Sequence, residues 1–473
     1  MSSIKPPLEL PHQTEGTQFL RENTAAALFD EQGLGKSKQV IDALNAQMTE
    51  RSIDAALIIC PNGLKTNWGQ EIEKFSTRTY AMFGAGRSAR RLAFRSLKSS
   101  FYVINYEAVD AELASLKALL RFKRIALVLD ESHRIKTPEA KTTRAVLALR
   151  SLAARRYILS GTPVANKPED LWSQMLFLDD GQALGNSAEQ FHETYGSASG
   201  GYRNLEQLRS RVATKSLRRL KATAVSLPSK EFRRVPVALT GRQAQMYSAM
   251  KTDLALWVRS MDGQDTEERA DAILARLVRL AQLASNPAML DAAYVETPAK
   301  FLQLDHELAG RMDDPAQKVL IWTSFVENIN ALRLRYARWN PVCIHGAIRN
   351  EERDTAVKAF KTDPDTRILI ANPAAAREGL TLTEANLAIY LDRTFNLVDY
   401  LQSQDRIHRI SQTRDCEIVL LIAQNTVDEF IDFTLEQKHR VAQFAQLDSE
   451  ELAAEDAMMI KPEGLRRLIQ DFD

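Results

Sequence analysis

Short apolar runs rich in β-branched residues recur along this chain, with helical patterns between them, and the series occurs twice. The runs are 55–61, 101–106, 125–131 and 156–161, and then 318–324, 341–346, 367–372, 387–392 and 416–423. Alternating strands and helices are typical of a parallel sheet with helices on both faces. We therefore predict an α/β fold with two such sheets, whose ligands lie at the carboxyl ends of the strands.

The strand pattern is interrupted in two places, which suggests how the lobes are organised. Helical periodicity dominates near 167–221 and again near 240–310, so we expect a helical insertion in each lobe. The turn Leu227–Pro228–Ser229 is the best candidate for a lobe boundary. We predict an N-terminal lobe over 1–227 and a C-terminal lobe over 228–473.

Composition narrows the class of protein. The 473 residues are 45% hydrophobic and 26% charged, which is typical of a globular protein with a sizeable core. No apolar run reaches the roughly 18 residues of a membrane span, and the first residues lack the apolar core of a secretion signal. We expect a cytoplasmic protein without a membrane partner, whose three distant cysteines are buried thiols rather than metal ligands.

Charge is balanced overall but uneven locally. The net charge of +1 argues against a globally basic nucleic-acid binder and leaves a local basic groove open. Residues 86–100 and 202–221 are basic runs, each of which alone is more often a solvated helix face than a binding site. The acidic run 448–456 is interpreted as plain surface.

Residues 30–37, DEQGLGKS, have the pattern of a phosphate-binding loop before a helix. Its members are Gly33, Leu34, Gly35, Lys36 and Ser37. Glycines let backbone N–H groups wrap phosphates at a helix N-terminus. Lys36 would reach the β- and γ-phosphates, and Ser37 would ligate Mg²⁺. Asp30 stands where the strict pattern has glycine, and a coincidental turn is the alternative interpretation.

Asp130 and Glu131 close the apolar strand LVLDESH. A carboxylate at this position can hold Mg²⁺ through its water shell, and an adjacent glutamate can deprotonate the attacking water. The alternative is an aspartate that caps the following helix. Gln13 precedes the loop, and its side-chain amide has the donor and acceptor needed to read adenine, although a surface glutamine is the simpler interpretation.

The segment QSQDRIHRISQ, residues 402–412, places Arg406 and Arg409 three residues apart. On a helix the pair would share one face and could reach developing charge on a phosphate, as an arginine finger does. A solvated amphipathic helix is the alternative. If both arginines act on a nucleotide held at Lys36, two lobes must close on it.

Taken in order, these segments and their neighbours resemble helicase superfamily two and, more narrowly, the Swi/Snf-type double-stranded DNA translocases. The resemblance runs from about Leu8 to Phe430. It is carried by PHQ (11–13), LFDEQGLGKS (28–37), IICPNGLKTNWGQEIEKF (58–75), FYVINYE (101–107), DESH (130–133), SGTPVANKPEDLW (160–172), SLRRLKATAVSLPSK (216–230), RLAQLASNPAML (279–290), KVLIWTSF (318–325), IHGAIRNEER (344–353), AREGLTLTEANLAIYLD (376–392), QSQDRIHRISQ (402–412) and NTVDEFI (425–431). The chain departs from the family at Ser132, where alanine is common, and at Arg377–Glu378, where glycines are usual.

The resemblance implies two RecA-like lobes, hydrolysis of ATP with Mg²⁺, and movement along double-stranded DNA. The residues it assigns to nucleotide binding are Gln13, Gly33, Leu34, Gly35, Lys36, Ser37 and Gly379. Ser37 and Asp130 would hold Mg²⁺, and Glu131 would activate water. Arg406 and Arg409 would complete the site from the second lobe when ATP closes the cleft.

The resemblance also implies DNA contacts that go mainly to phosphates. The candidates are Lys65, Thr66, Asn105, Asn166, Thr323, Ser324, Arg349 and Thr381. Two other functions stay open: a strand-separating helicase acting on branched DNA, and a non-catalytic DNA-clamping subunit. Double-stranded DNA is the expected partner, and a nuclease, a methyltransferase or another DNA-bound complex is a candidate protein partner.

Overall fold

The computed structural model describes residues 10–83, 98–197, 202–259, 267–375, 380–446 and 448–449. The chain divides into two compact units. The first unit comprises 1–226 together with Arg440–Ala457, and the second comprises 227–439 together with 458–473. The predicted lobe bounds stay a prediction. Among the described residues, no helix is long and apolar enough to cross a membrane.

The first unit is built on a seven-stranded sheet with the order β3-β4-β2-β5-β6-β1-β7. Every strand pairing in it is parallel. The strands are β1 (Ala25–Leu28), β2 (Ala55–Cys60), β3 (Tyr80–Met82), β4 (Phe101–Asn105), β5 (Ile125–Asp130), β6 (Arg155–Leu159) and β7 (Ser216–Leu217). Because all the strands run the same way, the segments that follow β1, β5 and β6 leave from one edge of the sheet.

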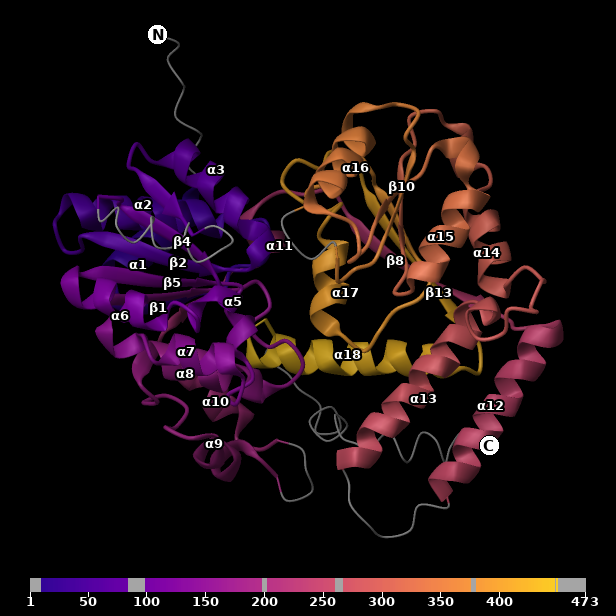
Figure 1. Cartoon of the computed structure of the whole chain (residues 1–473), viewed down its shortest axis with the longest axis horizontal. Helices are drawn as coiled ribbons and strands as arrows, with labels where there is room; N and C mark the ends of the chain where they lie inside the picture. The colour runs from indigo at the N-terminus through magenta and orange to yellow at the C-terminus, as the bar shows by residue number, and fades with distance from the viewer. Residues whose placement is uncertain are drawn as a thin grey trace. The chain divides into compact units, whose positions relative to one another are not determined.

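Helices cover both faces of this sheet (Figure 1). They are α1 (Pro11–Glu22), α2 (Lys36–Thr49), α3 (Lys65–Phe75), α5 (Tyr106–Val109), α6 (Leu113–Phe122), α7 (Lys141–Leu147), α8 (Trp172–Asp179), α9 (Ala188–Tyr195), α10 (Leu205–Ala213) and α11 (Lys221–Ala224). Val40 and Leu44 of α2 and Trp68 of α3 pack with Ile58 and Val128 of the sheet in one buried cluster. The core therefore fixes α2, which begins with Lys36 and Ser37, and α3, which carries Trp68.

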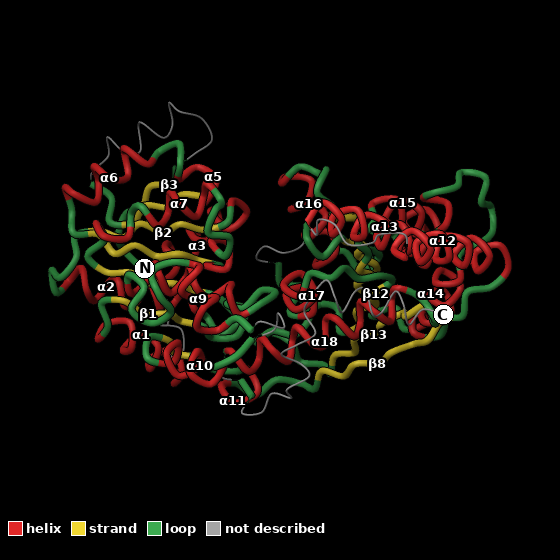
Figure 2. The backbone as a smooth tube through the Cα atoms, turned by 90° about the horizontal axis from the view of Figure 1, so that it is seen from below, coloured by secondary structure: helices red, strands yellow, loops and turns green. Residues whose placement is uncertain are grey.

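The second unit contains a six-stranded parallel sheet with the order β10-β11-β9-β12-β13-β8. Its strands are β8 (Lys230–Val237), β9 (Val319–Trp322), β10 (Val342–Ile344), β11 (Ile368–Ala371), β12 (Leu387–Tyr390) and β13 (Cys416–Ala423). The helices are α12 (Gly241–Arg259), α13 (Glu267–Ser285), α14 (Ala299–Leu308), α15 (Val326–Arg335), α16 (Asn350–Thr362), α17 (Leu397–Gln404) and α18 (Val427–Ala445), whose residues from Arg440 on belong to the first unit. In Figure 2 the strands of each unit are flanked by helices, which confirms the predicted fold class.

The predicted strands are all present, and the described part of the chain holds four further strands that the sequence did not indicate. These are β1, β3, β7 and β8. The strand β8 reads KEFRRVPV, and its charged residues and its proline at 236 do not form the apolar pattern by which the other strands were predicted. Charged residues and proline are tolerated in β8 because it is an edge strand of its sheet. The strands β3 and β7 are only 3 and 2 residues long.

One predicted helix differs from the observed structure. The helix expected over 402–412 ends at Gln404, so Arg406 and Arg409 lie in the turn that follows α17 and do not share a helix face. The predicted reason for their proximity is therefore wrong.

Candidate ATP site

The phosphate loop joins the end of β1 at Leu28 to the start of α2 at Lys36. Gly33 has φ of 90° and Gly35 has φ of 78°, a left-handed backbone that glycine adopts without strain. A β-carbon on Gly35 would come within 2.5 Å of Nε2 of Gln13. Both glycines are therefore required by the shape of the loop, and this shape presents backbone N–H groups at the start of α2.

The ammonium group of Lys36 lies against its own loop. Its Nζ donates to the carbonyl oxygens of Asp30 at 2.7 Å and of Glu31 at 3.3 Å. Burial lowers the pKa of Lys36, and the nearby carboxylates of Glu131, Asp30 and Asp130 oppose that shift. Of these three acidic groups, Asp130 and Glu131 are the carboxylates that the sequence analysis places at the phosphates of a nucleotide.

The glutamine predicted to read adenine lies against the phosphate loop. Gln13 is buried on α1, and its Nε2 donates to the carbonyl oxygen of Leu34 over 3.5 Å. Nε2 of His12 lies 3.0 Å from the same oxygen. Leu34 itself is fully buried, so it contributes to the loop through its backbone. The structure thus brings together two segments that the sequence separates by about 20 residues.

Asp130 ends β5 with both carboxylate oxygens engaged. Its Oδ1 accepts the backbone N–H of Glu131 at 3.0 Å, and its Oδ2 accepts the indole N–H of Trp68 at 2.8 Å. The hydroxyl of Tyr106 donates to the carbonyl oxygen of Asp130 at 2.8 Å. Burial raises the pKa of the Asp130 carboxyl, while the hydrogen bond from Trp68 and the charge of Lys36 oppose that shift.

Glu131 adopts a backbone conformation that is uncommon for a residue with a side chain. Its φ of 50° and ψ of 52° are left-handed, at a cost of about 1–3 kcal/mol. Its Oε2 lies 3.3 Å from Nδ1 of His133, which in turn lies 3.3 Å from Oγ of Ser160. The carboxylate predicted to activate water is therefore linked to the turn after β6. The backbone N–H of Thr162 donates to Oγ of Ser160 in the same turn.

The acidic residues that lead into the loop have a structural explanation. Asp30 is fully buried, and Nε and Nη2 of Arg219 donate to its two oxygens at 2.9 and 2.6 Å. The backbone N–H of Lys221 donates to Glu31 at 2.7 Å. Asp30, which departs from the strict loop pattern, thus anchors the segment after β7 to the loop.

Arg218 joins the phosphate loop to the C-terminal part of the first unit. Its Nη1 donates to the carbonyl oxygens of Phe29 and Gly161, at 2.5 and 3.0 Å. Its Nε and Nη2 donate to the two oxygens of Asp448, and both side chains are buried. Two surface interpretations are therefore wrong in part: Arg218 in the basic run 202–221 and Asp448 in the acidic run 448–456 are interior residues.

The residues present fit a bound Mg²⁺. Ser37, the second residue of α2, offers a hydroxyl oxygen, and Asp130 offers a carboxylate. Mg²⁺ favours few protein oxygens and keeps waters and substrate phosphates as its other ligands. Groups of three or more His, Cys, Asp or Glu side chains suited to a metal are absent from the part of the chain that the structure describes. The donor set therefore suits a metal that arrives with a nucleotide.

In the second unit, both predicted arginines contact the segment 380–382. Arg406 is buried, its Nη1 donates to the carbonyl oxygen of Leu380 at 3.1 Å, and its own carbonyl accepts the N–H of Leu382. Nη1 of Arg409 donates to Oγ1 of Thr381 at 2.8 Å. Gly379, predicted to contact nucleotide, lies outside the described residues.

The DNA candidates of the first unit fall in two places. Nζ of Lys65 lies 3.4 Å from Oδ1 of Asn105, so these two are brought together at the ends of β4 and α3. Thr66 is exposed beside Lys65. Asn166 lines a separate cavity of about 290 Å³ with Lys136. The basic run 86–100 lies almost wholly outside the described residues.

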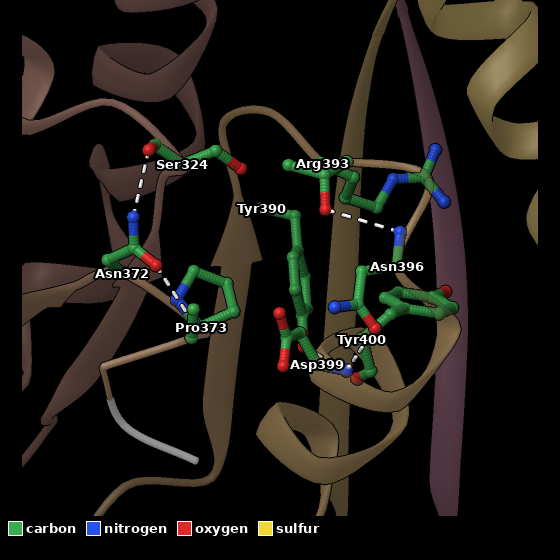
Figure 3. Close-up of a pocket in the computed structure, with 10 residues that line it drawn as sticks. Ser324, Asn372, Pro373, Tyr390, Arg393, Asn396, Asp399 and Tyr400 are labelled. Atoms are coloured by element: carbon green, nitrogen blue, oxygen red, sulfur yellow. Dashed lines mark hydrogen bonds between the residues drawn. The ribbon is translucent and has the colours of Figure 1, made fainter. Parts of the chain in front are cut away.

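The DNA candidates of the second unit differ in their exposure. Ser324 lines a cavity of about 150 Å³ at the carboxyl ends of β9, β11 and β12, where Nδ2 of Asn372 donates to its carbonyl oxygen (Figure 3). Thr323 is fully buried and its hydroxyl donates to Asp392, so it belongs to the interior and is a poor DNA contact. Arg349 is exposed at the start of α16.

Four residues that shape these sites were missed by sequence reasoning. They are Trp68, Arg218, Arg219 and Asp392. The Arg-Arg pair at 218–219 was visible as charge, but nothing local indicated that it faces the loop. Asp392 accepts the N–H of Ser324 at 2.6 Å and side-chain donors from three other residues, a burial pattern that only the assembled sheet creates.

The chain matches known protein families over most of its length. Residues 12–289 match the model of the SNF2-related domain, and residues 299–411 match that of the helicase conserved C-terminal domain. The chain is 28% identical to zebrafish (Danio rerio) chromodomain-helicase-DNA-binding protein 1-like, over 89% of this chain and 42% of that protein. It is 30% identical to the putative ATP-dependent helicase/translocase YwqA of Bacillus subtilis, over 90% of this chain and 48% of that protein.

Among solved structures, the chain is 27% identical to the SWI2/SNF2 ATPase core of Sulfolobus solfataricus in complex with dsDNA, with 95% of this chain and 96% of that chain covered and a TM-score of 0.43. The chain spans less than half the length of the zebrafish and Bacillus relatives. The SNF2-related model alone matches more than half of this chain, and the helicase model follows it in order. The chain therefore belongs to the SNF2 family, with an SNF2-related domain followed by a helicase C-terminal domain.

Proposed function

We propose that this protein is a DNA-dependent ATPase that translocates on double-stranded DNA and thereby remodels or displaces DNA-bound proteins. The observation that carries the proposal is the arrangement in the first unit. The phosphate loop at Lys36, the strand-end pair Asp130–Glu131 and Gln13 converge there on one edge of a parallel sheet. Family membership and the helicase/translocase name of the Bacillus relative support the same activity.

In the proposed reaction, the substrate is ATP. Gln13 contacts adenine, and the N–H groups of the loop from Gly33 to Ser37 surround the phosphates. Mg²⁺ held by Ser37 and Asp130 would neutralise charge on phosphate oxygens. Glu131 takes a proton from the attacking water. The water oxygen bonds to the γ-phosphorus as the bond to the β–γ bridging oxygen breaks, which gives ADP and phosphate.

The second unit would complete the site and carry part of the DNA path. We propose that the two units act as the ATP-binding lobe (1–227) and the helicase lobe (228–473), and that closure brings Arg406 and Arg409 to the γ-phosphate. Gly379 would add a backbone contact. DNA phosphates would meet the remaining candidates, with little reading of base edges. These candidates are Lys65, Thr66, Asn105, Asn166, Ser324, Arg349 and Thr381.

Two experiments separate this proposal from a strand-separating helicase. The first follows release of a third strand from a triplex on duplex DNA, and the second follows separation of a forked duplex, both with ATP use recorded. We expect ATP-dependent triplex release without strand separation. Strand separation matched to ATP use would instead favour the helicase. Protein partners, such as a nuclease or a methyltransferase, are a further part of the proposal that pull-down from the native cell would test.

A further inference from the structure

Trp68 is far from the phosphate loop in sequence, yet it contacts the carboxylate proposed to hold Mg²⁺. It lies on α3, fully buried, 62 residues before Asp130. Its indole N–H is a donor with no acceptor function, so it has one hydrogen bond to give. That bond goes to Oδ2 of Asp130 at 2.8 Å, within the ordinary range for such a bond.

The two hydrogen bonds to the Asp130 carboxylate use half of its capacity to accept hydrogen bonds. An ionised carboxylate has about four lone-pair sites, and Trp68 and the N–H of Glu131 occupy one on each oxygen. One site on each oxygen stays for other donors, such as the waters of a hydrated cation. Rotation of the carboxylate would break both hydrogen bonds in a buried place, where an unmade hydrogen bond is unfavourable because no water replaces it.

The backbone beside this carboxylate is fixed as well. The carbonyl oxygen of Asp130 accepts the hydroxyl of Tyr106 at 2.8 Å, so the main chain at the strand end is held in addition to the carboxylate. Trp68 is in turn held by packing with Ile72 of its own helix and with the sheet residues of the buried cluster. The indole N–H that donates to Asp130 is therefore held in place by the packing of its own side chain.

We propose that Trp68 is a positioning residue for Mg²⁺ binding: its indole N–H holds Asp130 in the one orientation that receives the hydrated metal of Mg·ATP. This inference rests on the proposed ATPase function. Removal of a group that hydrogen-bonds a metal-binding side chain and fixes its orientation typically lowers metal affinity or activity by about 10–100-fold. The competing explanation is that Trp68 only fills the core, in which case its N–H would have no effect on metal binding.

The test is Trp68→Phe, which removes the N–H and keeps an aromatic ring. Binding of fluorescent ADP is titrated with and without Mg²⁺. We expect the gain in ADP affinity that Mg²⁺ provides to fall by about tenfold, while ADP affinity without Mg²⁺ stays unchanged. The Mg²⁺ concentration for half-maximal ATP turnover should rise by a similar factor. An unchanged Mg²⁺ gain, or an equal loss of affinity with and without Mg²⁺, would overturn the inference.

Two further variants make the test specific. Trp172→Phe is the matched control, because its indole also donates a hydrogen bond, a partly buried one to the carbonyl oxygen of Gly185 at 3.0 Å, and it should leave the Mg²⁺ gain unchanged. In an Asp130→Asn background, Trp68→Phe should have no further effect on that gain. Additive effects of the two substitutions would contradict the inference.

Further outcomes distinguish a loss of folding, and a failure of the proposed ATPase function, from a failure of the inference about Trp68. If Trp68→Phe does not fold, replacement of the indole by benzothiophene keeps the bicyclic shape and has sulfur in place of the N–H, and the same tenfold loss is expected. Absence of Mg²⁺-dependent ADP binding in the unchanged protein would refute the proposed function and the inference with it. A Mg²⁺ gain that is normal in the unchanged protein and survives loss of the N–H would refute the inference alone.

Discussion

Arg406→Ala is expected to lower duplex-stimulated ATP turnover by about 10³-fold or more, with ATP affinity nearly unchanged, because an arginine that meets charge only in the transition state contributes to rate and little to binding. In the structure its guanidinium is buried and donates to the carbonyl oxygen of Leu380. The measurement is turnover at saturating ATP together with the affinity for a non-hydrolysable analogue.

Arg414→Ala is the matched control for this substitution. Nη2 of Arg414 also donates to a backbone carbonyl oxygen of the second unit, that of Glu384 at 2.6 Å, but Arg414 lies outside the proposed site. It should leave turnover within about twofold of the unchanged protein, the range expected where no transition-state contact is lost. Equal losses of ATP affinity and turnover in Arg406→Ala would count against a transition-state role. A thermal melt of both variants excludes a loss of folding.

Glu131→Gln is expected to reduce ATP turnover by about 10²–10⁴-fold, because the amide keeps the size of the side chain but cannot take a proton from water. Its contact with His133 can persist through an amide, so ATP binding should be retained. Single-turnover kinetics with radiolabelled ATP measures the chemical step directly.

Glu139→Gln provides the comparison, since Glu139 is exposed on the loop that follows the strand-end pair and is not among the proposed catalytic residues. Turnover that is unchanged in Glu131→Gln would refute the role of Glu131. It would also revive the hypothesis of a DNA-clamping subunit that does not depend on ATP hydrolysis.

The sequence was most informative where local chemistry and sheet topology agree. Asp130 ends a strand, and Lys36 and Gln13 lie in the first turn of a helix, each in a recognisable pattern. The parallel sheet then brings them together at the carboxyl ends of its strands. Strands such as β2 and β5 were identified because every one of their residues is buried, which produces a continuous apolar run.

Contacts over long sequence distances could not be predicted in the same way. Trp68 reaches Asp130, and Arg219 reaches Asp30 across 189 residues, and no local pattern encodes either pair. The turn after Gln404 was misread as helix because Arg406 and Arg409 have the three-residue spacing of one helix face, although both lie beyond the end of α17. Spacing alone does not distinguish a helix from a turn, and here Ile407, between the two arginines, packs in the core of the second unit.

The central claim is that ATP hydrolysis by this protein depends on double-stranded DNA. The most direct test is the steady-state rate of ATP hydrolysis by the full chain, measured without DNA, with single-stranded DNA and with duplex DNA of the same sequence. We predict that the duplex raises the rate by about tenfold or more, a lowering of the barrier by about 1.4 kcal/mol, and that single-stranded DNA raises it far less. A rate that is the same in all three conditions would contradict the account.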